Sequence, residues 1–126
     1  MRTEVEFNQN TGIVTTRFFE TLTIEEVKAA IGGIIRNKEY VPGMKGIYDL
    51  THANLSDIDG EMVEELSIQI ERLSKGRIGR PRVALVSENA LNYGTVSLFR
   101  EYYVDMVTEL EVFESLIDAE KWLLKG

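Results

Sequence analysis

The chain has 126 residues, of which 44% are hydrophobic and 28% are charged, and its formal net charge at pH 7 is -7. These proportions are typical of one globular domain with one hydrophobic core, and they exclude a disordered chain. No apolar run has the length of a membrane span, and the N-terminal segment lacks the apolar stretch of a secretory signal. The acidic balance disfavours binding to nucleic acid or anionic lipid. We therefore expect a single cytoplasmic domain over residues 1–126.

Cysteine is absent, and the chain has one histidine, His52. Disulfides and thiolate chemistry are thereby excluded. One histidine per chain rules out a multi-histidine metal site and restricts acid–base chemistry near neutral pH. A Ser-His-Asp arrangement of Ser56, His52 and Asp57 lacks the local sequence of a nucleophile turn. The sequence therefore predicts a protein that is not an enzyme and that holds neither a metal nor a cofactor.

The chain is expected to open with a β-hairpin and a helix. Apolar and acidic residues alternate over residues 5–7, and residues 13–19 are mostly β-branched or aromatic, with the turn-forming segment 8–12 between them. Thr23 and Glu26 have the spacing of a capping box, which marks the start of a helix.

The expected helix contains two glycines, and a Pro-Gly pair follows it in the sequence. Gly32 and Gly33 lie inside the expected helix, where we expect them to allow close packing against a neighbouring element, a hinge being the alternative. The Pro-Gly pair at residues 42–43 interrupts the chain, and residues 45–50 then predict a short buried strand. This boundary would place His52 in the loop after the strand.

The second half alternates helices and strands. Apolar residues recur at helical spacing in three segments and form short continuous runs between them. The expected elements are a helix over 57–73, a strand over 83–86, a helix over 90–106, a strand at 112–113 and a helix opened by Ser115. The resulting order, β-β-α-β-α-β-α-β-α, predicts an α/β fold with a mixed, largely parallel sheet and about four helices.

The C-terminal third has a pattern that resembles a known family. Residues 82–86, 93–94, 112–113 and 119–123 are similar to the SpoIIAA-like proteins, a small bacterial family related to the STAS domains of anti-sigma-factor antagonists. The hairpin and the Asp-Leu pair at residues 49–50 extend the resemblance over most of the chain. The resemblance implies a SpoIIAA/STAS-like sandwich and a regulatory, non-enzymatic module for protein–protein interaction.

In the antagonists, a central strand ends in Asp-Leu and leads to an Asp-Ser-Ser-Gly turn whose second serine is phosphorylated. Counting on from Asp49 without a gap matches Asp57 and Gly60 to the ends of this turn. Asp59 stands at the acceptor position, and its carboxylate cannot receive phosphate as that serine does. It either imitates phosphoserine with a smaller charge or only serves the helix start. By resemblance, Ser56, Asp57, Asp59 and Gly60 would bind another protein, for example an anti-sigma-type kinase.

Two charged segments have simpler interpretations. The acidic residues from Asp57 to Glu65 lack the further oxygen ligands of a calcium loop, so we expect a helix start and a solvated face. The basic, glycine-containing segment 75–80 lacks the Gly-Lys-Ser/Thr end of a phosphate-binding loop. We expect a connecting loop there, a phosphate contact being the alternative.

The helix expected over 90–106 has an apolar and aromatic arc wider than a plain amphipathic stripe. Core packing accounts for most of these residues. The alternatives are a homodimer contact, or a groove for a small apolar or lipid-like ligand between this helix and the sheet, although a chain of this size has little room for a cavity. The surface would comprise Tyr93, Phe99, Tyr102, Tyr103 and Met106.

Overall fold

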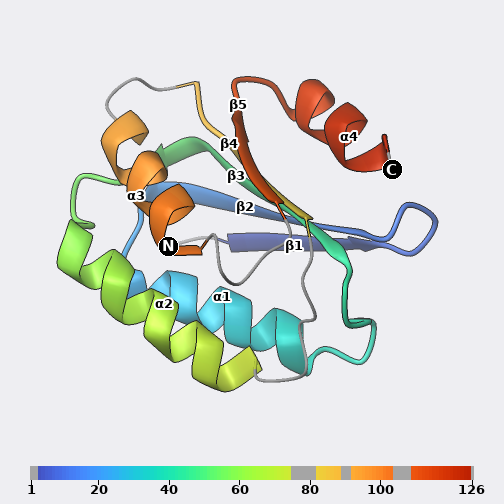
Figure 1. Cartoon of the computed structure of the whole chain (residues 1–126), viewed down its shortest axis with the longest axis horizontal. Coiled ribbons are helices and arrows are strands. Elements are labelled where there is room, and N and C mark those ends of the chain that lie inside the picture. Colours follow the sequence, from blue (N-terminus) through green and yellow to red (C-terminus); the bar gives the residue numbers. More distant parts are fainter. Residues whose placement is uncertain (1–2, 75–81, 89–91, 104–108, 126) are drawn as a thin grey trace.

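A computed structural model describes residues 3–74, 82–88, 92–103 and 109–125 (Figure 1). Within these ranges, five strands form one sheet in the order β1-β2-β3-β4-β5, with β1 antiparallel to β2 and the other neighbours parallel. The strands are β1 (Thr3–Asn8), β2 (Ile13–Thr21), β3 (Lys45–Asn54), β4 (Arg82–Val86) and β5 (Glu109–Phe113). The predicted mixed, largely parallel sheet is confirmed.

In the described part of the chain, four helices cover the two faces of the sheet unequally (Figure 1). They are α1 (Ile24–Arg36), α2 (Gly60–Ser74), α3 (Tyr93–Tyr103) and α4 (Leu116–Leu124). The first three lie on one face, and α4 packs on the other, against β3, β4 and β5. The element order is the one that the sequence predicts. None of the helices described has both the length and the apolar character needed to cross a membrane.

The alternation of side chains in β4 explains its continuous apolar sequence. Val83 and Leu85 belong to the main core cluster under α1, α2 and α3, whereas Ala84 and Val86 belong to the cluster under α4. Successive residues of a strand point to opposite faces, so a strand with helices on both sides must be apolar at every position.

The capping box at the start of α1 is confirmed. The backbone N–H of Glu26 donates to the Thr23 hydroxyl at 3.3 Å, and the Glu26 carboxylate accepts the Thr23 N–H at 3.2 Å. Two backbone donors at the helix end are satisfied by these bonds.

The boundary predicted for the strand after residue 50 is wrong. β3 continues to Asn54, so His52 lies in the strand rather than in a loop. The register between β2 and β3 shifts between Arg17 and Phe19, and beyond the shift Phe19 pairs with His52. The irregularity interrupts the alternation of apolar and polar residues, which is why the sequence pattern ends too early.

Close packing does not explain the two glycines of α1. Among the described residues, a Cβ added at Gly33 would meet nothing within 4 Å, and one at Gly32 would meet the Arg36 guanidinium of the same helix at 3.2 Å. Neither glycine contacts a described part of a neighbouring element closely enough to require the absence of a side chain, so that expectation is wrong.

Candidate functional site

The turn between β3 and α2, which comprises residues Leu55–Asp59 and is called the β3–α2 turn below, lies at the carboxyl ends of the parallel strands. Leu55 and Ile58 are buried, with 1% and 5% of their surface exposed, and the Ile58 N–H donates to the Leu55 carbonyl at 3.1 Å. The Ser56 N–H donates to the Asn54 side chain at 2.9 Å. These contacts fix the turn and leave Ser56 and Asp57 exposed.

A buried asparagine from another part of the chain holds the start of this turn. Asn92 has 2% of its surface exposed, and its Nδ2 donates to the Ala53 carbonyl at 3.0 Å. Its Oδ1 accepts the Leu55 N–H at 3.2 Å. Sequence reasoning missed this residue. The sequence signal that could have identified it was an amide side chain shortly after a central strand. Such a residue lies near the carboxyl ends of the strands, where binding sites of α/β folds usually form.

Asp59 is the cap of α2. Its carboxylate accepts the Met62 N–H at 2.9 Å, and its carbonyl accepts the Val63 N–H at 3.1 Å. The contacts agree with the interpretation in which Asp59 serves the helix start, because they are those of an N-cap residue. Gly60 begins α2 beside α3, where an added Cβ would lie 3.6 Å from the Leu98 side chain.

The exposed side of the turn and of α2 is strongly acidic and includes two apolar side chains. Met62 and Ile68 are 36% and 46% exposed. We call this surface the acidic face; its carboxylates, all exposed, are Asp57, Asp59, Glu61, Glu64 and Glu65. Within the described ranges, no three histidine, aspartate or glutamate residues come together in a way that suits a metal ion.

His52 is exposed and stacks on Phe19, with ring centroids 5.8 Å apart and ring planes at 3°. Among the described residues, no hydrogen bond joins His52 to Ser56 or Asp57. The neighbouring Glu20 has a φ of 63°, in the left-handed region that is costly for a residue with a side chain.

The described apolar and aromatic side chains of α3 pack against the core. Val96 is fully buried, and Phe99 and Tyr102 are half-buried against the main core cluster. Met106 and the side chains of Tyr93 and Tyr103 lie outside the described residues. For the part that is described, core packing is therefore the interpretation that fits.

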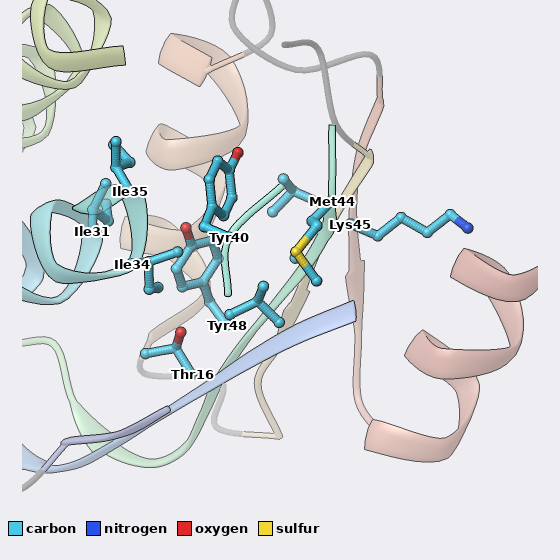
Figure 2. A pocket seen from close by; sticks show the side chains of 11 residues that line it. Thr16, Ile31, Ile34, Ile35, Tyr40, Met44, Lys45 and Tyr48 are labelled. Atoms are coloured by element: carbon cyan, nitrogen blue, oxygen red, sulfur yellow. The ribbon is translucent and has the colours of Figure 1, made fainter. Parts of the chain in front are cut away.

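A small hollow lies between α1 and the sheet, where Thr16 and Tyr48 reach from the strands toward the helix (Figure 2). Its volume of about 50 Å³ has room for a few water molecules only. Burial raises the pKa of Tyr48 to about 12, and the nearby Tyr40 adds to the rise. Burial also raises the pKa of Tyr40, although a backbone hydrogen bond from Gly43 acts in the opposite direction. The Thr16 hydroxyl is buried without a partner among the described residues.

The comparisons with known proteins concern the fold. No family model matches the sequence, and no curated protein matches it. Among solved structures, the chain is similar to an uncharacterized protein of the DUF3478 family with a SpoIIAA-like fold from Shewanella loihica PV-4. The two are 20% identical, with a TM-score of 0.53, over 97% of this chain and 92% of the other. Together with the sheet order and the helix layers, this similarity shows that the chain has a SpoIIAA-like fold.

Proposed function

We propose that this chain is a non-enzymatic regulatory module of STAS type, which binds another protein through the β3–α2 turn and the acidic face. The observation that supports this proposal most directly is the turn itself. Ser56 and Asp57 are exposed on a backbone that Asn92, Leu55 and Ile58 hold from beneath. A docking surface that is already ordered loses little conformational entropy when a partner binds.

The charges and the exposed side chains define the chemistry of the partner. An acidic rim around Met62 and Ile68 is complementary to a surface with basic residues around an apolar centre. Charge complementarity of this kind accelerates association and is weakened by salt. We therefore expect a basic protein partner, whose binding weakens as the ionic strength rises.

Asp59 has a structural role in this proposal. Its carboxylate accepts the Met62 N–H and so caps α2 at the end of the turn. The family resemblance assigns the phosphorylated serine to the position that Asp59 occupies, so the serine switch is absent from this proposal. Regulation would then depend on whether the partner is present.

The experiment is affinity capture from extracts of the cell that makes the protein, with three matched baits. The double variant Asp57→Asn, Asp59→Asn removes two charges but keeps a good capping side chain at residue 59. Asp118→Asn is the control, since Asp118 is an exposed carboxylate in the first turn of α4, on the other side of the sheet. We expect one defined protein to bind the wild type and the control but not the double variant. A set of bound proteins that is identical for all three baits, or empty, contradicts the proposal.

The alternative function, binding of a small apolar or lipid-like ligand between α3 and the sheet, gains no support from the described residues. Val96, Phe99 and Tyr102, which would line such a site, contribute to the core instead. Native mass spectrometry of the purified protein tests this alternative, because a co-purifying ligand would add a defined mass.

A further inference from the structure

Two hollows lie against α1, and they differ in the polarity of their linings. The wider one is a groove of about 620 Å³ beside β1, where small residues of the helix, including Gly33, face a strand on which Val5 is exposed. Among the described residues that line this groove, the buried one, Ile34, is apolar. The narrower hollow, between α1 and the strands β2 and β3, is lined in part by residues with hydroxyl groups. The narrower hollow is therefore the one with groups that a ligand can bind.

The Thr16 hydroxyl is the most deeply buried of these groups. Thr16 is 1% exposed, and it lies on β2 between Val14 and Phe18, whose side chains point to the same face and pack in the core under α1. No described group forms a hydrogen bond with its hydroxyl. Burial of a hydroxyl without a hydrogen bond is unfavourable, so valine, which has the same shape, would be more stable here if the hydroxyl stayed unbonded. A partner from outside the chain removes this penalty.

A second hydroxyl lies on the neighbouring strand. Tyr48 of β3 is the register partner of Thr16, and both residues line the hollow. Figure 2 shows the two side chains on the side of the sheet that faces α1. No described residue forms a hydrogen bond with the Tyr48 hydroxyl. The hollow thus offers two hydroxyls, each of which can both donate and accept a hydrogen bond.

The size and the charge of the hollow define what it can hold. Its volume is about 50 Å³, whereas one water molecule needs about 10–15 Å³ and a cavity that binds benzene has about 150 Å³. Lys45 is the charged residue among the described lining, and its ammonium group points away from the hollow (Figure 2). The occupant must therefore be very small and neutral, and able to donate and to accept hydrogen bonds. Water has these properties.

We propose that this hollow is a hydration site, in which ordered water bonds to the hydroxyls of Thr16 and Tyr48 and links β2 to β3 beneath α1. The water completes the hydrogen bonding of two groups that have no partner among the described residues. Tyr40, in the segment after α1, also lines the hollow, so the water joins this segment to the sheet. The site is separate from the β3–α2 turn, and either proposal can fail without the other.

Crystal diffraction from the full chain, to a resolution at which ordered water is visible, tests the proposal directly. We expect water oxygens at about 2.7–2.8 Å from the hydroxyls of Thr16 and Tyr48. In the variant Thr16→Val, at least one of these water molecules should be lost. A hollow without water density, or a direct hydrogen bond between the two hydroxyls, would overturn the proposal.

Thermal unfolding gives an independent test in solution, with Thr16→Val, Tyr48→Phe and the double variant. Thr15→Val is the matched control, because Thr15 is a buried residue of the same strand whose side chain points to the other face. The melting temperature of Thr16→Val should lie at or below that of the control, by up to about 6 °C. The double variant should lose less than the sum of the two single losses, because both hydroxyls bind the same water. A melting temperature of Thr16→Val above that of the control, or strictly additive losses, would contradict the proposal.

Discussion

Replacement of Asp59 separates its capping role from its charge. The Asp59 carboxylate accepts the Met62 N–H at 2.9 Å, so alanine at this position leaves that donor without its protein partner. Loss of an N-cap side chain costs about 1 kcal/mol, within a range of about 0.5–2 kcal/mol. Asparagine keeps a capping oxygen and loses only the interaction of the negative charge with the helix dipole, which for an exposed residue is about 0.3–1 kcal/mol.

The size of the domain converts these energies into melting temperatures. An unfolding entropy of about 2.1 cal/mol/K per residue gives about 0.26 kcal/mol/K for 126 residues, so 1 kcal/mol corresponds to a shift of about 4 °C. We expect Asp59→Ala to lower the melting temperature by about 4 °C, and Asp59→Asn by roughly half as much or less. Thermal unfolding followed by circular dichroism measures both. Equal losses for the two variants, or no loss with alanine, would refute the capping role.

Three further predictions concern stability. Glu20→Gly should be neutral or stabilising, by up to about 1 kcal/mol in urea unfolding, because glycine tolerates a φ of 63°, whereas Thr21→Gly, in the same strand, should destabilise by about 0.5–1 kcal/mol. Asn92→Ala should lower the free energy of unfolding by about 2 kcal/mol or more, since it leaves two buried backbone groups unpaired. A loss below about 0.5 kcal/mol would show that the hydrogen bonds of Asn92 to the turn are unimportant. The pKa of Tyr48 is raised to about 12, so its neutral form stabilises the fold fully below about pH 10, and this contribution is lost as the pH rises toward 12. An absorbance titration should show a tyrosine that ionises near pH 12 and that Tyr48→Phe removes.

The fold was largely predictable because its main determinants are local. The capping box of Thr23 and Glu26, the continuous apolar run of β4 and the turn before β2 each depend on residues close together in the sequence. Their order alone restricts the arrangement to a mixed sheet with helices on its faces.

The candidate site was less predictable because it depends on distant contacts. Asn92 bonds to residues 37 and 39 positions away, and no spacing rule links such partners. The length of β3 depends on its irregular pairing with β2 beyond Arg17. The groove beside β1 exists because small residues of α1, including Gly33, face a strand on which Val5 is exposed. Each of these features needs the three-dimensional arrangement.

Site-specific photo-crosslinking can detect a partner protein bound to the acidic face. A photoreactive amino acid is placed at Ile68, which is 46% exposed on α2, and in a second variant at Ile117, which is 65% exposed on α4. In extracts of the cell that makes the protein, we expect one defined adduct from position 68 that disappears with the double variant Asp57→Asn, Asp59→Asn, and no such adduct from position 117. The same adduct from both positions, or none from position 68, would contradict it.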